Sequence, residues 1–237
     1  MREGDRVLEV GAGLGSLTVA LAASGAKVLA VEIDRALVPA LEEVLVPFPN
    51  VRLEIGDAMR MDWGSLLEGS GWKMVSNLPY NVSVPLLLDL LERVPAIGGY
   101  LVMVQREVGE RLVAGPGEEA YGAASVRVAY RAYAELVRRV SASVFWPRPE
   151  VASVLLRLVP QPAGIDVDER ALFRVVEEGF AERRKTMSNA LRRIGSDRSS
   201  AARLLRASGV DPLSRAEDLG LERFAAIANA LVQEGVL

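Results

Sequence analysis

The sequence predicts an α/β fold in which a mostly parallel sheet ends in an antiparallel hairpin and is followed by a small all-α domain. Over the first 114 residues, strand-like apolar runs alternate with helix-like runs, a pattern typical of a parallel sheet with helices on both faces. After the Gly/Pro-rich segment 113–117, strand-like runs follow one another. After 160–164 the pattern is helical to the end. We therefore expect two domains, 1–160 and 161–237.

The expected elements follow from apolar periodicity and from the Gly, Pro and polar residues between them. Strands are expected near 6–10, 27–32, 51–55, 72–77 and 99–104, with helices near 15–24, 35–46, 83–93 and 105–114. The hairpin region is expected to contain strands near 124–131, 135–141 and 151–159. In the C-terminal region a helix around 172–180, with Asp168 as its N-cap, precedes helices at 186–194, 198–207 and 221–233.

The composition excludes several kinds of chemistry. The 237 residues include no cysteine and no histidine, which excludes disulfides, thiolate nucleophiles, histidine bases and the usual zinc ligand sets. Any reaction must use carboxylates, amides, phenols, Lys, Arg or a cofactor, and no metal is expected. Residues 1–5 do not resemble a signal peptide, and the apolar run 82–91 is too short to span a bilayer. We expect a cytoplasmic protein.

The segment Asn77-Leu78-Pro79-Tyr80 supplies one amide among apolar and aromatic groups, directly after an expected strand. Pro79 ends that strand because proline donates no ladder hydrogen bond. In an open α/β sheet, ligands bind at the carboxyl ends of the strands. The segment therefore suits a flat nitrogenous ring, although Asn and Pro are also ordinary turn formers.

The first expected strand runs into a glycine loop, Gly11-Ala12-Gly13-Leu14-Gly15, preceded by Glu9. Glycine lets the backbone approach a ligand closely. A nicotinamide fingerprint would need glycine at position 16, which is serine here, so the spacing disfavours that cofactor.

Two acidic residues end the next two expected strands. Glu32 could accept both hydroxyls of a ribose, and Asp57 could accept from an adenine amino group. Either could instead cap a helix. Together with the glycine loop they suit a nucleoside without a pyrophosphate, for which S-adenosyl-L-methionine is the obvious candidate. Its sulfonium supplies the reactivity, so neither a histidine nor a metal is needed.

The sequence resembles the KsgA-type ribosomal RNA adenine N6,N6-dimethyltransferases (RsmA) over nearly its whole length. The resemblance rests on the order of several motifs, of which the Phe-x-Pro-x-Pro and Arg-Arg-Lys-Thr blocks are the most specific. The motifs are Glu9-Val10-Gly11-Ala12-Gly13-Leu14-Gly15-Ser16-Leu17-Thr18, Val31-Glu32-Ile33-Asp34, Gly56-Asp57-Ala58, Asn77-Leu78-Pro79-Tyr80-Asn81, Gln105-Arg106-Glu107-Val108, Tyr121-Gly122, Phe145 to Val154, and Phe180 to Thr186.

This resemblance implies a class I, Rossmann-like methyltransferase domain with a seven-stranded sheet, and a small helical C-terminal domain. It implies transfer of two methyl groups from S-adenosyl-L-methionine to each of two adjacent adenosines near the 3′ end of small-subunit rRNA. The implied catalytic residues are Asn77, Leu78, Pro79 and Tyr80, with Asn77 and the Leu78 carbonyl holding the amino group and Tyr80 stacking on the base. The candidate cofactor-binding residues are Glu9, Gly11, Gly13, Gly15, Glu32, Ile33, Asp57, Ala58 and Asn77.

Basic residues gather in one part of the neutral C-terminal region. From Arg183 to Arg206 there are eight basic side chains and one acidic side chain, Asp197. Such a cluster is typical of a phosphate-binding surface, although a solvated helix face has the same composition. The candidate RNA-binding residues are Phe145, Trp146, Arg183, Arg184, Lys185, Arg192 and Arg193. The expected partner is small-subunit rRNA in a precursor subunit, bound by a monomer.

Other functions share parts of this pattern. A large-subunit rRNA adenine dimethyltransferase that confers antibiotic resistance would share Asn77 to Tyr80, and a DNA adenine methyltransferase would share the core. A non-catalytic ribosome-assembly factor could keep the same fold. Members of the family have a segment before the first strand, whereas Met1 lies only five residues before it here, which predicts either a truncated chain or a misplaced start.

Overall fold

The computed structural model describes residues 1–145, 149–162 and 164–237. The chain forms two compact units, each described by itself below. The first contains 1–109 and 132–161, and the second contains 110–131 and 162–237. The predicted domains, 1–160 and 161–237, differ from these units in where 110–131 belongs, and they remain a proposal for how function is divided along the chain.

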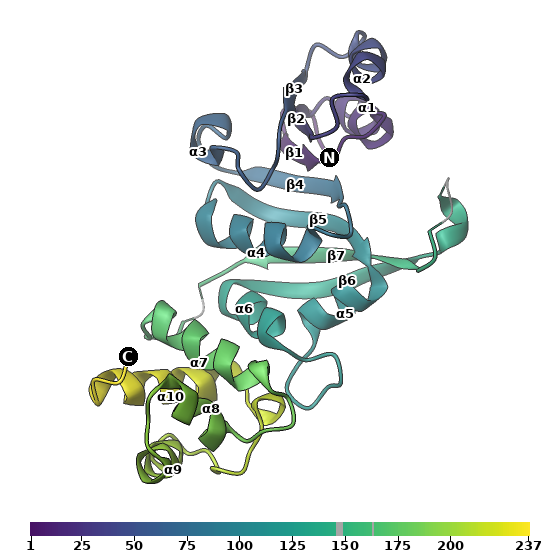
Figure 1. Ribbon diagram of the computed structural model, residues 1–237. Coiled ribbons are helices and arrows are strands. Elements are labelled where there is room, and N and C mark those ends of the chain that lie inside the picture. The colour runs from purple at the N-terminus through teal and green to yellow at the C-terminus, as the bar shows by residue number, and fades with distance from the viewer. Residues whose placement is uncertain (146–148, 163) are drawn as a thin grey trace. The chain divides into compact units, whose positions relative to one another are not determined.

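The first unit is built on a seven-stranded sheet with the strand order β3-β2-β1-β4-β5-β7-β6 (Figure 1). The pairs β1–β2, β2–β3, β1–β4 and β4–β5 are parallel, and β7 pairs antiparallel with both β5 and β6. The expected terminal hairpin is therefore present. The strands are β1 (Arg6–Val10), β2 (Lys27–Glu32), β3 (Val51–Ile55), β4 (Trp72–Asn77), β5 (Ile97–Gln105), β6 (Ala132–Val140) and β7 (Ser153–Pro160).

Helices follow each of the first five strands, as the alternating pattern predicts. They are α1 (Ser16–Ala23), α2 (Val38–Leu45), α3 (Trp63–Leu66), α4 (Ser83–Arg93) and α5 (Arg106–Val113), the last of which ends in the second unit. The one-turn helix α3 was not predicted. Its four residues are too short to show a helical period.

The apolar strands bury both faces of the sheet's centre. Val7 and Leu8 on β1 are fully buried, and because neighbouring strand residues point to opposite faces, both faces must be covered. On one face Val7, Val28 and Ala30 form a core with Leu21 of α1 and Leu41 of α2. This packing fixes the carboxyl ends of β1, β2 and β4, from which the site residues extend.

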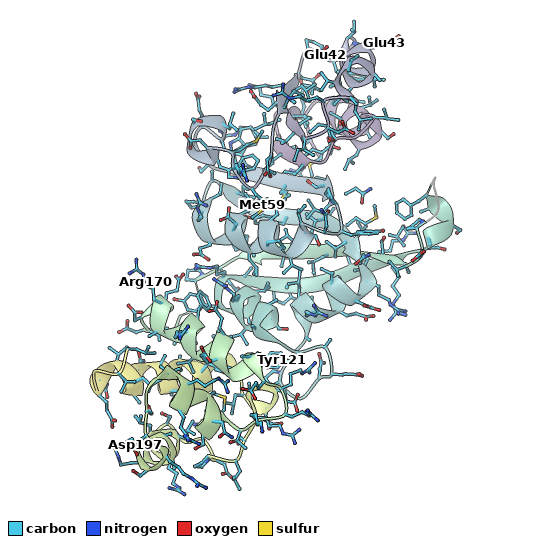
Figure 2. All side chains as sticks on the ribbon, in the orientation of Figure 1. Glu42, Glu43, Met59, Tyr121, Arg170 and Asp197 are labelled. Atoms are coloured by element: carbon cyan, nitrogen blue, oxygen red, sulfur yellow. The ribbon has the colours of Figure 1, made fainter. Side chains whose placement is uncertain are left out.

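The second unit is helical. It contains α6 (Ala123–Arg131), α7 (Glu169–Ala181), α8 (Met187–Ile194), α9 (Arg198–Ala207) and α10 (Leu221–Gln233). Leu172, Leu191, Leu205 and Phe224, from four of these helices, are fully buried in one core. Tyr121, labelled in Figure 2, donates from its buried hydroxyl to the Leu219 carbonyl at 2.8 Å.

The strand predicted at 124–131 was wrong, because these residues form helix α6. The alternation of Val126, Val128 and Tyr130 with polar residues favoured a strand. In the structure Val126 is buried and Tyr130 contacts Phe173 edge to face, with ring centroids 5.5 Å apart. These residues are four apart and meet α7 on one helical face, so tertiary packing overrides the β-branched composition.

No helix in the described part of the chain is long and apolar enough to cross a membrane.

Candidate active site

A cavity of about 330 Å³ opens at the carboxyl ends of β1, β2 and β3, beside the start of α4. This volume is within the range of small-molecule sites. Its wall is mainly apolar and includes two carboxylates. The lining residues are Val10, Gly11, Gly13, Val31, Glu32, Ile33, Gly56, Asp57, Ala58, Met59, Pro79, Asn81, Val82 and Leu86.

The glycine loop is shaped by left-handed backbone. Gly11, Gly13 and Gly15 have φ values of +81°, +57° and +83°, a region that side-chain-bearing residues rarely adopt. A Cβ on Gly11 would lie 3.3 Å from Pro79 Cδ, and a Cβ on Gly13 would meet no atom within 4 Å. The loop therefore touches the Asn77 to Tyr80 segment at Gly11 and leaves open space for a ligand at Gly13.

Gly15 has a structural function in this loop. A Cβ at this position would come within 2.9 Å of Leu41 Cδ1 on α2. Gly15 also begins α1 and is absent from the cavity wall.

Glu32 ends β2 and holds the loop in place. Its carboxylate is buried and accepts from the Gly13 amide at 2.7 Å and from the Ile33 and Asp34 amides at 2.9 Å each. These backbone amides compensate the burial of a charge. Two carboxylate oxygens offer about four acceptor positions, so Glu32 keeps capacity for a ligand donor in the cavity.

Glu9 is a second buried carboxylate, on β1. It is 1% exposed, and its Oε2 has no hydrogen-bond partner among the described residues. Burial raises the pKa of Glu9 to about 7, the Thr18 side chain opposes this shift, and the charge of Glu32 reinforces it. Glu9, two residues before the glycine loop, thus changes its charge near neutral pH.

Asp57 follows β3 and organises the turn after it. Its carboxylate accepts from the Met59 amide at 2.9 Å, and its second oxygen lies 3.5 Å from Arg60 Nε. The side chain remains 39% exposed. Asp57 is therefore both a turn-capping residue and a cavity residue, so the two interpretations of this acid do not exclude each other.

The Asn77 to Tyr80 segment is a turn that leads from β4 into α4. The Leu78 amide donates to the Met103 carbonyl at 3.1 Å, and the Val82 amide donates to the Pro79 carbonyl at 3.3 Å. Leu78 is buried, which anchors the turn, whereas Asn77 is exposed. The Asn77 amide forms no hydrogen bond within the described ranges, so its polar atoms are available to a ligand.

Tyr80 is held from a second strand. Its hydroxyl and the Ser153 hydroxyl are 3.1 Å apart and share a hydrogen bond. Ser153 is buried at the start of β7, where it pairs with Gln105 of β5. Since Ser153 is fixed in the sheet, this bond restricts the direction of the Tyr80 ring.

The structure brings together seven of the predicted cofactor and catalytic residues around the cavity: Gly11, Gly13, Glu32, Ile33, Asp57, Ala58 and Pro79. The other predicted residues do not line it: Glu9, Gly15, Asn77, Leu78 and Tyr80. Seven further residues line it but were not predicted as site residues: Val10, Val31, Gly56, Met59, Asn81, Val82 and Leu86. Met59 and Asn81 lie within two residues of Asp57 and Tyr80, whereas Leu86 lies six residues after Tyr80 and had no such signal.

The predicted RNA-binding residues lie in both units. Phe145 is half-buried in the β6–β7 connection, and Trp146 lies outside the described residues. In the second unit Arg184, Lys185 and Arg192 are exposed. Arg183 and Arg193 are instead occupied by the protein's own acceptors, the Glu119 carbonyl and Glu217 for Arg183, and Glu178 and Glu182 for Arg193.

The cavity fits S-adenosyl-L-methionine on its donor chemistry. The apolar residues Val31, Ile33 and Met59 suit a flat base, and Glu32 suits ribose hydroxyls. Glu32 and Asp57 give the cavity a negative potential that favours a cationic ligand. The open space at Gly13 can receive a ligand that a side chain would exclude.

Comparison with known proteins agrees with this geometry. The family model described as "Ribosomal RNA adenine dimethylase" matches residues 1–233. The chain belongs to the ribosomal RNA adenine dimethylase family. Ribosomal RNA small subunit methyltransferase A of Moorella thermoacetica is 44% identical over 239 residues, which cover 96% of this chain and 83% of that protein. Its counterpart in Bacillus mycoides is 40% identical over 236 residues, which cover 95% and 81%.

Solved structures share the fold of this family. A dimethyladenosine transferase from Plasmodium falciparum superposes with a TM-score of 0.81 at 22% identity, covering 99% of this chain and 92% of that one. The 23S rRNA methyltransferase ErmE superposes with a TM-score of 0.67 at 23% identity, covering 98% and 93%. The predicted family, Rossmann-like methyltransferase fold, rRNA adenine dimethyltransferase activity and S-adenosyl-L-methionine cofactor are confirmed.

Proposed function

We propose that this chain dimethylates N6 of two adjacent adenosines near the 3′ end of 16S (small-subunit) rRNA, acting as a monomer on a precursor subunit during its assembly. The observation that carries this proposal is the contact between the two loops of the site. Gly11 is so close to Pro79 that a Cβ would lie 3.3 Å from it. The methyl donor's cavity and the Asn77 to Tyr80 segment are therefore adjacent, as group transfer between two bound molecules requires.

On the donor side, Gly11 and Gly13 give the cofactor access to the backbone, and Glu32 accepts from its ribose. Ile33 and Ala58 would hold its base, and Asp57 would accept from the adenine amino group. When bound, the cofactor supplies an electrophilic methyl group on a sulfonium. Glu9, on β1 before the loop, adds negative charge only as the pH rises through about 7. Gly15 sets the path of the loop, and Asn77 would meet the cofactor from the acceptor side.

On the acceptor side, Asn77 and Leu78 make the target amino group nucleophilic. The lone pair of an adenine amino group is delocalised into the ring. If Asn77 Oδ1 and the Leu78 carbonyl each accept one N–H, the nitrogen becomes tetrahedral and its lone pair is directed at the methyl group. The N–CH₃ bond would form as the S–CH₃ bond breaks and leaves a neutral thioether, and the proton of the resulting ammonium would pass to water.

The target base must leave its stack, which costs a few kcal/mol. Tyr80 recovers part of this by stacking on the base, a contact worth roughly 1–3 kcal/mol. Pro79 stiffens the turn that presents Tyr80, and the Ser153 hydroxyl fixes the phenol. Phe145 and Trp146 provide further aromatic surface for the RNA.

The second unit supplies the phosphate-binding surface through Arg183, Arg184, Lys185, Arg192 and Arg193. These residues lie in the stretch of eight basic side chains and one acidic side chain. Arg184, Lys185 and Arg192 are exposed and are the direct candidates for phosphates. Arg183 and Arg193 contribute less to phosphate binding, because each already forms an ion pair with a glutamate of the protein.

Methylation of under-methylated small subunits with labelled cofactor tests the proposal. We expect label on N6 of two neighbouring adenosines near the 3′ end of the small-subunit rRNA and none on large-subunit rRNA. Label on large-subunit rRNA alone would assign the chain to the resistance type. Intact rRNA binding without cofactor binding or label would indicate an assembly factor without catalysis.

A further inference from the structure

We propose that a second cavity, between the end of α8 and the start of α9, binds a single phosphodiester group of the RNA. Its volume is about 590 Å³, and it lies wholly within the second unit. Its wall is polar, with four basic and two acidic side chains. The lining residues are Glu182, Lys185, Asn189, Arg192, Arg193, Ser196, Asp197 and Arg198.

Ser196 points to a ligand in this cavity. The residue is 7% exposed, and its hydroxyl has no hydrogen-bond partner in the described part of the chain. Leaving a buried hydroxyl unpaired is unfavourable, and most such groups in proteins are satisfied. A phosphate oxygen in the cavity would accept from this hydroxyl.

The cations of the cavity fall into two groups. Arg193 donates to Glu178 at 2.9 Å and to Glu182 at 3.1 Å, so its charge is balanced within the protein. Lys185, Arg192 and Arg198 are exposed and form no ion pair with the residues that the structure describes. These three cations are available to an anion, and two of them flank Ser196 in the sequence.

Asn189 offers a further donor. One of its amide hydrogens goes to Thr186 Oγ1 at 3.2 Å, which orients the side chain and leaves its second N–H available. The cavity therefore combines point charges with two neutral donors, Asn189 and Ser196. Such a combination is suited to the several acceptor oxygens of a phosphate.

Asp197 contributes a negative charge to the cavity wall. This residue, labelled in Figure 2, caps α9 by accepting from the Ser199 amide at 2.8 Å and the Ser200 amide at 3.0 Å. These bonds, with those from the two serine hydroxyls, hold the pKa of Asp197 well below its usual range. The four cations of the wall outnumber Asp197 and Glu182 by two, so the cavity still attracts a phosphate group.

This inference rests on the RNA-binding part of the proposed function and narrows it. It replaces Arg193 by Arg198 as a phosphate-binding residue and adds Asn189 and Ser196. Lys185 and Arg192, the other two cations of the cavity wall, keep their predicted role.

A salt titration of binding to a fragment of the 3′ region of small-subunit rRNA tests it. For Arg192→Gln and Arg198→Gln we expect the slope of log affinity against log salt to fall by about 0.7–0.9 each, because one phosphate contact is lost. Arg203→Gln is the matched control. Arg203 lies in the same stretch, but both of its terminal nitrogens bind Glu234, so its slope should be unchanged.

Ser196→Ala should weaken binding about fivefold, the effect of one neutral hydrogen bond, with the slope unchanged. In NMR titrations of the full chain, a dinucleoside monophosphate should shift the second-unit amides around this cavity and should compete with inorganic phosphate for it. Tighter binding of inorganic phosphate would assign the cavity to free phosphate.

Unchanged slopes in both Arg192→Gln and Arg198→Gln, with thermal unfolding as in the wild type, would overturn the inference. Failure of the proposed function has a different signature. In that case the labelled-subunit assay shows no methylation while RNA binding still depends on Arg192 and Arg198.

Discussion

The Tyr80 hydroxyl lies 3.1 Å from the Ser153 hydroxyl, so the segment after β4 is tied to the first residue of β7. A ring that stacks on a mobile base needs a fixed direction, and among the described residues the Tyr80 hydroxyl has no hydrogen-bond partner other than Ser153. Ser153 is buried in the sheet and can supply that support. Ser153 is thus a positioning residue for the proposed base-binding tyrosine.

Removing this hydrogen bond should slow methylation modestly. For Ser153→Ala and Tyr80→Phe we expect single-turnover rates about fivefold lower, because one neutral hydrogen bond is lost. The double variant should be no slower than either single variant, since both changes remove the same bond. Tyr80→Ala, which also removes stacking, should lose far more. Additive effects of the two conservative changes would show that Ser153 acts independently of Tyr80.

Asn77→Ala should reduce methyl transfer by about 100- to 1,000-fold, the range seen when one preorganised polar contact to a transition state is removed. The exposed Asn77 amide has no structural hydrogen bond to lose among the described residues, so folding should be unaffected. Affinity for RNA should stay near the wild-type value. A single-turnover assay with saturating cofactor measures the rate, and a wild-type rate would exclude the proposed role of Asn77.

Glu32→Gln should weaken the binding of S-adenosylhomocysteine, measured by calorimetry, about 10- to 100-fold, because hydrogen bonds to a charged acceptor are replaced by weaker ones. Glu54→Gln is the control. Glu54 is on β3 and pairs with Arg52 at 2.6 Å, outside the cavity wall. Equal effects of the two changes would indicate that only net charge matters.

Glu9 should make stability depend on pH. Its folded-state pKa is about 7, against an ordinary value of 4.5, so the native state holds the proton more tightly than the unfolded chain does. The associated stability is present below pH 4.5 and is lost as the pH rises through 7. Glu9→Gln should match the wild type in unfolding free energy near pH 4.5 and exceed it by about 3 kcal/mol at pH 8. Urea titrations across this range measure the difference, and parallel pH profiles would contradict it.

Gly13→Ala and Gly15→Ala should separate binding from folding. Both positions have positive φ, so each change costs about 1–2 kcal/mol of stability. Gly15→Ala should cost more because its Cβ would meet Leu41 at 2.9 Å, whereas Gly13→Ala places a methyl group in the open cavity. We expect the larger loss of unfolding free energy for Gly15→Ala and the larger loss of cofactor affinity for Gly13→Ala. The reverse order would refute this division of roles.

Much of the fold was predictable because its signals are local. The alternation of apolar runs identified β1 to β5 and α4 nearly to the residue. The prediction of a strand at 124–131 was wrong because the spacing of its apolar residues fits both the strand period and the helix period. Only contacts with Phe173 and the rest of the helical core select the helix. The short helix α3 carried too few residues for any period to be visible.

The sequence predicted those site residues that combine a suitable residue type with a position at the end of an expected strand. Gly11, Gly13, Glu32 and Asp57 combine these two features, and all four line the cavity. Ser153 and Ser196 were not predictable, because a lone serine has no sequence signal until its neighbours are known.

The sequence by itself determined the family, the alternating α/β order and the motifs that end the strands, because these depend on residue type and spacing along the chain. Only the tertiary structure decided which of those residues meet. It separated Gly13, open to the cavity, from Gly15, packed on Leu41. It also showed that Arg193 is already paired with glutamates while Arg192 remains available. Such distinctions depend on distances between segments far apart in the chain, and those distances are set by the packing of the core.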